Sequence, residues 1–246
     1  IWGDGTYRLP ERLQLDIADT ALIAAAGYVN EVLAPYGTVA VDRCDRGDIV
    51  LELDSAALPP EGYRLSVTHA GVRIGGGSYR GVVNGIATLR QLLPAKAGSG
   101  AKIPYAEIAD RPAFGWRGVM LDVSRHFFDK EEIFTLLDQM ARLKLNKFHW
   151  HLTDDQGWRI EIDAYPRLTE TGAFRRDTTL AGEPGTFGGY YTKRQIRDIV
   201  EYAARRYIEV VPEIDMPGHM TAALASYPEL GCTGGPYVIT PQPGVR

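Results

Sequence analysis

Three stretches of the sequence decide the fold: GVMLDVSRH at residues 118–126, KFHWHLTDDQGW at 147–158 and VVPEIDMPGH at 210–219. Each begins with apolar, β-branched or aromatic residues, as a buried strand does, and then passes into polar and ionisable residues. In a (β/α) barrel the carboxyl ends of the parallel strands meet on one face, and that face carries the active site. Ionisable side chains are costly to bury without a partner or a function. The three stretches therefore predict neighbouring barrel strands with a polar site at their ends.

The segments between these strands predict amphipathic helices with defined starts. Asp129 with Glu132, and Thr192 with Gln195, each have the spacing of a capping box, and apolar residues follow both pairs at helical intervals. Strands that alternate with such helices indicate βαβ units and a parallel sheet. The segment 171–189 is polar and rich in glycine and proline, which predicts a long loop on the strand-end face.

The first 110 residues predict a small α+β domain. Its strand-like runs are 38–41, 49–53, 63–67 and 72–74, the last two joined by a turn, and its two helices begin near Thr20 and Ser78. We place a domain boundary near residue 110, with an N-terminal domain at 1–110 and the barrel at 111–246. The predicted fold class is α/β: the first three or so strands of a (β/α)8 TIM barrel, preceded by a small α+β domain.

Composition excludes several classes of protein. The 246 residues are 45% hydrophobic and 24% charged, with a formal net charge of -4, as in an ordinary globular protein. No basic run predicts binding to nucleic acid or to an anionic membrane surface, and no apolar run reaches the roughly 18 to 20 residues that span a bilayer. The start, IWGDGTYRLPE, lacks the pattern of a signal peptide. Cys44 and Cys232 fit buried thiols as well as a bridge, so their redox state is left open.

His149 and His151 lie two residues apart in a strand and therefore point to the same side. Such a pair can hold a divalent ion, so a metal-dependent barrel hydrolase that uses His149, His151 and His219 is one hypothesis. The other is that the two strand histidines hydrogen-bond inside the barrel and brace neighbouring strands. Asp154 follows the strand at a turn, where it could face His219 from the next strand.

Four blocks of sequence closely resemble the β-N-acetylhexosaminidases of glycoside hydrolase family 20. They are WRGVMLDVSRHFF, KFHWHLTDDQGWR, GGYYT and VVPEIDMPGH, and the resemblance covers roughly residues 111–230. It implies a retaining exo-glycosidase that removes terminal β-linked N-acetylglucosamine or N-acetylgalactosamine. The substrate's own 2-acetamido group would act as the nucleophile and form an oxazolinium ion. No metal and no cofactor are implied.

The resemblance also implies roles for single residues. Arg125 should hydrogen-bond the hydroxyl groups on C3 and C4 of the terminal sugar; the alternative is a salt bridge to a barrel carboxylate. Asp154 and His219 should support the catalytic acid, and Asp215 should lie beside them. Among the tryptophans, Trp116 and Trp150 lie beside or within strands and are predicted core residues. Trp158 follows the turn and is the candidate for stacking on the sugar at the rim.

The sequence departs from the family at one important point. The family carries its catalytic Asp-Glu pair in an HxGGDE-like motif on the fourth barrel strand, and no such motif occurs here. A whole barrel takes about 250 residues. We therefore expect the chain to be a fragment that needs the rest of the barrel from the same or another chain. An inactive sugar-binding fragment is the third hypothesis. The family implies a secreted, periplasmic or lysosomal enzyme acting on an amino-sugar glycoside.

Overall fold

A computed structural model describes residues 1–17, 19–42, 47–177 and 185–241. Cys44 lies outside these residues, whereas Cys232 is exposed. The chain divides into two compact units: one contains Ile1–Arg117 with Asp138–Asn146 and Ala204–Ile208, and the other contains Gly118–Leu137, Lys147–Ala203 and Glu209–Arg246. Every helix in the described parts of the chain is too short or too polar to cross a membrane.

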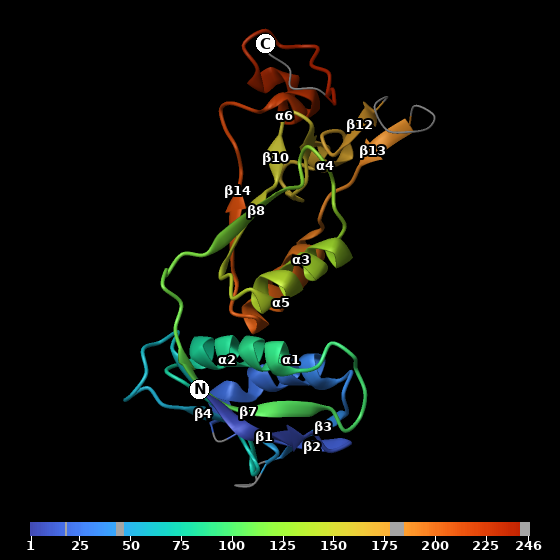
Figure 1. The fold of residues 1–246 in the computed structure, drawn as a ribbon. Helices are drawn as coiled ribbons and strands as arrows, with labels where there is room; N and C mark the ends of the chain where they lie inside the picture. The colour runs from blue at the N-terminus through green and yellow to red at the C-terminus, as the bar shows by residue number, and fades with distance from the viewer. Residues whose placement is uncertain (18, 43–46, 178–184, 242–246) are drawn as a thin grey trace. The chain divides into compact units, whose positions relative to one another are not determined.

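The first unit is built on a seven-stranded mixed sheet (Figure 1). Its strands are β1 (Trp2–Arg8), β2 (Arg12–Ile17), β3 (Thr38–Asp42), β4 (Ile49–Leu53), β5 (Tyr63–Thr68), β6 (Gly71–Gly76) and β7 (Lys102–Asp110). They lie in the order β1-β7-β5-β6-β4-β2-β3. The four strands from β6 to β3 pair in parallel, and the pairs that involve β1, β5 and β7 are antiparallel.

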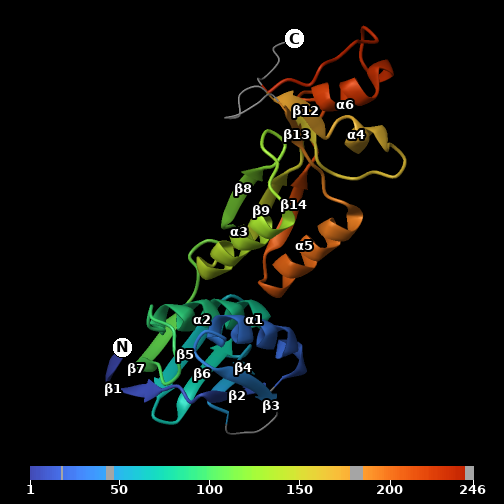
Figure 2. The same cartoon turned by 90° about the vertical axis from the view of Figure 1, so that its right-hand side faces the viewer.

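Two helices, α1 (Ile23–Leu33) and α2 (Tyr79–Leu92), cover one face of this sheet (Figures 1 and 2). The hydroxyl group of Ser78 accepts a hydrogen bond from the N–H of Arg80, which confirms the predicted start of α2. A 3₁₀ turn at Thr20–Leu22 precedes α1, and Asp19, not Thr20, caps it. The buried side of α2 rests on the sheet with fully buried Val82, Ile86 and Leu89.

The predicted hairpin is confirmed as β5 and β6, but the sequence prediction missed β1, β2 and β7. β1 contains Gly3 and Gly5, and β7 contains Pro104, residues that argue against a strand. The glycines have a structural reason. A Cβ atom on Gly5 would lie 2.5 Å from the ring of Tyr105, so the ring needs the space that glycine leaves.

The second unit contains the three predicted barrel strands. They are β8 (Gly118–Asp122), β9 (Lys147–His151) and β14 (Glu209–Glu213), which form a parallel sheet in the order β14-β9-β8 (Figure 2). The register places Asp122 beside His151 and His151 beside Glu213. The polar ends of the strands therefore coincide, as predicted for part of a TIM barrel.

Helix α3 (Lys130–Arg142) follows β8, and helix α5 (Lys193–Arg205) precedes β14. Both predicted capping boxes are confirmed. The N–H of Glu132 donates to the carboxylate of Asp129, whose own N–H donates to the carboxylate of Glu132. Thr192 and Gln195 make the same exchange. The two helices contact each other through stacked aromatic rings, Phe134 on Tyr202, with centroids 4.0 Å apart.

Shorter elements follow the strand ends. They are the hairpin strands β10 (Thr153–Asp154) and β11 (Gly157–Trp158), the strands β12 (Phe174–Asp177) and β13 (Gly185–Gly188), and the helices α4 (Arg167–Glu170) and α6 (Thr221–Ser226), with a 3₁₀ turn at Pro228–Leu230. Within the described part of the predicted loop over 171–189, β12 and β13 pair as an antiparallel ribbon, which the sequence analysis did not foresee. Residues 178–184 lie outside the described residues.

Candidate active site

The site begins where β8 ends, with an aspartate that shapes the following turn. One carboxylate oxygen of Asp122 accepts from the N–H groups of Ser124 and Arg125, both at 3.0 Å, and the other accepts from Nη1 of Arg125 at 2.6 Å. Burial favours the neutral carboxyl group, but the hydrogen bonds from Arg125 outweigh it and lower the pKa of Asp122. Asp122 thus holds both the backbone and the side chain of Arg125.

Asp154 lies at the centre of the site, at the end of β10, and is only 1% exposed. Its Oδ2 atom lies 2.7 Å from Nη2 of Arg125 and 2.8 Å from Nε2 of His151. Its Oδ1 atom lies 3.1 Å from Nδ1 of His219 and accepts from the N–H of Asp155 at 2.7 Å. His151 and the N–H of Asp155 make hydrogen bonds to this carboxylate, and Arg125 and His219 lie at ion-pair distance from it. The buried charge is therefore paired on every side.

His151 connects Asp154 with β14. Its Nδ1 atom lies 2.7 Å from Oε2 of Glu213, an ion-pair contact and not a well-aligned hydrogen bond. His149 reaches the same oxygen through Nε2 at 2.5 Å. Burial would lower the pKa of His151, but the contacts with Glu213 and Asp154 outweigh it and raise the pKa. Both strand histidines thus brace β9 against β14, as one of the sequence hypotheses proposed.

The same contacts act on Glu213. Burial would raise the pKa of this carboxyl group, but the contacts with His151 and then His149 outweigh burial and lower it. Glu213 is therefore ionised at neutral pH, and it gives the two histidines a fixed negative charge at the end of β14.

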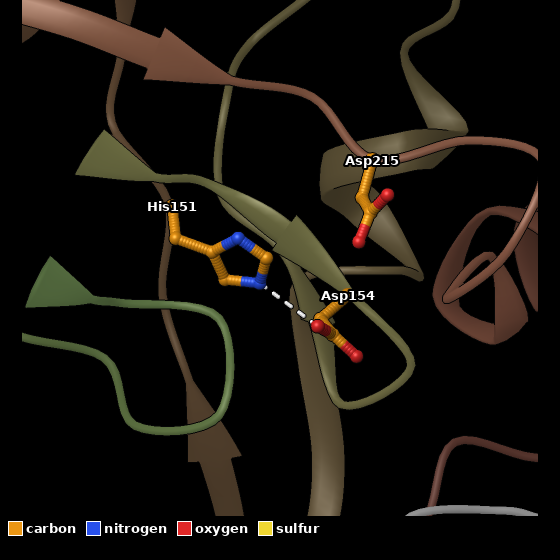
Figure 3. Close-up of side chains that lie close together, drawn as sticks. All are labelled: His151, Asp154 and Asp215. Atoms are coloured by element: carbon orange, nitrogen blue, oxygen red, sulfur yellow. Dashed lines mark hydrogen bonds and ion pairs between the residues drawn. The ribbon is translucent and has the colours of Figure 1, made fainter. Parts of the chain in front are cut away.

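The segment after β14 brings two further predicted residues to the site. The N–H of Asp215 donates to Oγ1 of Thr153 at 2.9 Å, and Figure 3 shows the Asp215 side chain directed toward Asp154 and His151. His219 has a φ angle of 55°, in the left-handed region that is uncommon for residues other than glycine. Its side chain is 51% exposed. His219 therefore presents one ring edge to Asp154 and leaves the other accessible.

The structure brings together Arg125, Asp154, Asp215 and His219, which the sequence predicted from three separate strand ends. Arg125 also makes the alternative contact foreseen for it, a salt bridge to barrel carboxylates. The two interpretations are compatible, because 45% of the arginine side chain stays exposed while Asp122 and Asp154 hold it. The catalytic and binding roles of these residues stay predictions.

Trp158 lies elsewhere than expected. It is 5% exposed and packs with Leu168, Ala222 and Ala223, and its indole N–H donates to the carbonyl oxygen of Ile160 at 2.8 Å. Its expected position at an accessible rim is therefore wrong, and its part in sugar binding stays a prediction. The expectation for Trp116 is also wrong, since this predicted core residue is 64% exposed; Trp150, at 1%, is buried as predicted.

Two sets of residues have ligand atoms close enough to share a cation: His151, Asp154 and Asp215, and Asp154, Asp155 and His219. Asp154 belongs to both sets and already accepts from the permanently charged guanidinium of Arg125. Within the described parts of the chain, His149, His151 and His219 do not meet as one set of ligands. The arrangement therefore fits charge pairing better than the predicted three-histidine metal site.

The sequence analysis missed two arginines that contact the backbone of the turn after β8. Arg159 is fully buried and Arg175 is 7% exposed, and both donate to backbone carbonyl groups around Arg125. An arginine close to a predicted turn usually indicates an exposed surface, so nothing in the sequence predicts that these two arginines are buried. Only the burial of both side chains reveals them.

Arg125, Asp154 and His219 converge at the carboxyl ends of a parallel sheet, which is the face on which (β/α) barrel enzymes carry their active sites. The sequence matches two domains described as glycosyl hydrolase family 20, catalytic domain, over residues 114–243, and glycosyl hydrolase family 20, domain 2, over residues 2–111. The chain belongs to glycosyl hydrolase family 20.

Relatives and solved structures agree with this membership. The chain is 51% identical over 191 residues to a beta-hexosaminidase of Porphyromonas gingivalis, an alignment that covers 75% of this chain and 24% of that protein. It is 39% identical to a beta-hexosaminidase of Vibrio furnissii, over 92% of this chain and 38% of the relative. The chain thus spans well under half the length of these relatives.

Among solved structures, the N-acetyl-beta-hexosaminidase of Streptomyces plicatus in complex with Thio-NAglucal superposes with a TM-score of 0.88 at 40% identity, over 99% of this chain and 49% of that one. An exo beta-N-acetylglucosaminidase of Vibrio harveyi in complex with N-acetylglucosamine gives 0.85 at 36% identity, over 94% and 37%. These likenesses support the fold assigned above, a partial TIM barrel preceded by a small α+β domain.

Proposed function

We propose that this chain forms part of a retaining exo-β-N-acetylhexosaminidase that removes terminal β-linked N-acetylglucosamine or N-acetylgalactosamine. Membership of family 20 and the names of the relatives support a glycosidase with this preference. The observation that carries the proposal is the guanidinium of Arg125. It is fixed by Asp122 and Asp154 and remains half-exposed beside His219.

Arg125 is suited to bind two neighbouring hydroxyl groups. Nη1 donates to Asp122 and Nη2 forms an ion pair with Asp154. A guanidinium has five N–H groups, so further N–H groups in the same plane remain for a ligand. The guanidinium is rigid and always charged, which fits the hydroxyl groups on C3 and C4 of a terminal sugar. In the proposed mechanism this contact places the ring so that the acetamido oxygen can attack the anomeric carbon.

Asp154 and His219 are suited to assist a proton transfer. Because Nδ1 of His219 faces the carboxylate of Asp154, that nitrogen carries hydrogen and Nε2 is left to interact with an acid group. Asp154 would stabilise positive charge on the imidazole while the acid group protonates the leaving oxygen. Asp215 lies close to Asp154 and His151, on the side of the site that follows β14.

The mechanism also needs a carboxylic acid and a carboxylate that orients the acetamido group. The motif in which the family carries them does not occur in this sequence, so we propose that the rest of the barrel supplies both. The substrate would be an amino-sugar glycoside, and the localisation proposed from the family is secreted, periplasmic or lysosomal.

Hydrolysis of 4-nitrophenyl N-acetyl-β-D-glucosaminide by the full protein that carries this sequence tests the proposal. We expect turnover with retained anomeric configuration and inhibition by a thiazoline mimic of the oxazolinium ion. The matched control is the β-glucoside that lacks the acetamido group, which should not be turned over. Failure of the thiazoline to inhibit would contradict substrate assistance. Loss of activity with a chelator, together with a stoichiometric ion, would favour the metal-dependent alternative.

A further inference from the structure

The turn that carries Arg125 has every backbone polar group paired. Among the N–H groups of residues 123–125, that of Val123 donates to the carbonyl oxygen of His151 at 3.2 Å, and the next two donate to the carboxylate of Asp122. The three carbonyl oxygens all accept from arginine side chains. Unpaired buried backbone groups are costly, so the conformation of this turn depends on all of these partners.

The carbonyl partners are Arg159 and Arg175. Nε of Arg159 donates to the carbonyl oxygen of residue 123 at 3.0 Å, and Nη2 donates to that of residue 124 at 2.7 Å. Nη2 of Arg175 donates to the carbonyl oxygen of residue 125 at 3.0 Å. Three consecutive carbonyl groups therefore accept hydrogen bonds from arginine side chains, and the carboxylate of Asp122 accepts from two of the N–H groups.

Arg159 also ties this turn to the segments on either side of the β12–β13 ribbon. Its Nη1 atom donates to the carbonyl oxygen of Ala173 and, at 3.1 Å, to that of Gly189. This guanidinium is fully buried, and no carboxylate of a described residue pairs with it. Its hydrogen-bond partners here are four carbonyl groups. Burial, with the nearby charge of Arg175, lowers the pKa of Arg159 to about 10. The ring of Phe127, whose centroid lies 5.7 Å from Cζ, also faces this guanidinium. Burying a cation without a carboxylate partner is costly.

A glycine makes room for the Arg159 side chain. A Cβ atom on Gly157 would lie 2.3 Å from Cζ and from Nη2 of Arg159, closer than such atoms approach in proteins. The substitution Gly157→Ala would therefore displace the guanidinium without changing any charge. It gives a second, independent way to disturb the same contacts.

We propose that Arg159 and Arg175 are positioning residues for sugar recognition: by fixing the carbonyl groups of residues 123–125, they set where Arg125 presents its guanidinium to the substrate hydroxyl groups. The inference rests on the proposed function, because it takes Arg125 as the sugar-binding residue. Lysine cannot replace Arg159, since a single ammonium group cannot reach the carbonyl groups of the turn together with those of Ala173 and Gly189, as the planar fork does.

The test compares two substrates in the full protein: 4-nitrophenyl N-acetyl-β-D-glucosaminide and its 4-deoxy analogue. The ratio of their kcat/KM values reports how well the arginine contacts the C4 hydroxyl. A hydrogen bond to a charged group corresponds to a ratio of about tenfold or more in the unchanged protein. Because both values come from the same preparation, a variant that only loses folded protein keeps the ratio.

We expect the ratio to fall toward 1 in Arg159→Lys, Arg159→Met, Arg175→Met and Gly157→Ala, as it does in Arg125→Ala. The matched control is Arg167→Met, which removes a half-exposed arginine paired with Glu229 outside the site and should leave the ratio unchanged. If the Arg159 variants do not fold, Arg175→Met and Gly157→Ala decide the question alone.

Two failures can be told apart. An unchanged ratio in the Arg159, Arg175 and Gly157 variants, with a collapsed ratio in Arg125→Ala, would overturn the positioning role and leave the sugar contact intact. An unchanged ratio in Arg125→Ala itself would overturn the proposed sugar contact and the inference with it.

Discussion

Nδ1 of His219 lies 3.1 Å from Oδ1 of Asp154, although the two residues follow different strands of the sheet. The aspartate is buried and the histidine is half-exposed, so the pair joins the interior of the protein to its accessible face. In the proposed enzyme this pair supports the acid group, and its removal should affect the step in which the leaving oxygen is protonated.

His219→Asn tests this role, because asparagine tolerates the left-handed backbone at this position better than alanine does. We expect kcat for a glycoside with a poor leaving group to fall by about 100-fold, within the usual range for general acid catalysis. A 2,4-dinitrophenyl glycoside, whose leaving group needs little protonation, should lose much less. Equal losses for both substrates would contradict a role in proton transfer.

Arg125→Lys tests the sugar contact. Lysine keeps the charge but cannot bridge Asp122 and Asp154 and still offer paired N–H groups to a ligand. We expect kcat/KM to fall by about 10-fold to 100-fold, the value of one or two charged hydrogen bonds. Steady-state kinetics measure the change, with Arg167→Lys as the matched control. An unchanged kcat/KM would contradict a contact between Arg125 and the substrate.

His151→Gln tests the charge on the buried histidine, which faces Asp122 of β8, Asp154 of β10 and Glu213 of β14. The pKa of His151 is raised in the folded protein, so its contribution to stability is complete below the unfolded pKa and is lost as pH rises through the folded one. The loss of Tm caused by the substitution should therefore be larger near pH 6 than near pH 9, values either side of the ordinary pKa of about 6.5. Thermal unfolding at both pH values measures it, and an equal loss would mean that His151 is neutral in the fold.

Gly27 and Gly81 form a matched pair of helical glycines with opposite expectations. A Cβ atom on Gly27 meets nothing within 4 Å, so Gly27→Ala should stabilise the protein by about 0.5–1 kcal/mol. A Cβ atom on Gly81 would lie 2.1 Å from the carbonyl oxygen of Gly62, so Gly81→Ala should destabilise it, by roughly 1–3 kcal/mol. Chemical denaturation measures the change in the free energy of unfolding for both variants. A change of the same sign in the two would contradict the difference in packing between Gly27 and Gly81.

Trp158→Phe separates packing from sugar stacking. Phenylalanine keeps most of the apolar contact with Leu168 and the α6 alanines but loses the hydrogen bond to Ile160, so we expect a fall in Tm of a few degrees, from about 1 kcal/mol. KM should stay the same. A raised KM with an unchanged Tm would support the predicted contact between Trp158 and the sugar.

The sequence was sufficient for the parts of the site that follow a regular rule. Arg125, Asp154 and His219 each follow a strand with a clear apolar pattern, and parallel strands must bring their carboxyl ends together. The capping boxes were equally visible, because they depend on residues three positions apart. The family resemblance then supplied roles that spacing alone left open.

The parts that were missed depend on contacts that have no local pattern. Arg159 is an arginine in a polar stretch, and only the folded chain shows that it is buried among carbonyl groups. Pro104 and the glycines of β1 hid two strands. The glycines are needed because the side chain of Tyr105, on the neighbouring strand, lies where their Cβ atoms would be. Trp158 follows a turn, as exposed residues often do, but α6 returns from a distant part of the sequence to cover it.

The fully paired turn after β8 has a practical meaning for protein engineering. We expect that Arg125, the arginine proposed to bind the sugar, cannot be transferred to another barrel as a single residue, because its turn and side chain are held by residues from other parts of the chain. The transferable unit is the whole set: Asp122, Arg125, Asp154, Gly157, Arg159 and Arg175. Libraries that seek altered sugar preference should therefore keep this set constant and vary the residues that surround the exposed end of the guanidinium.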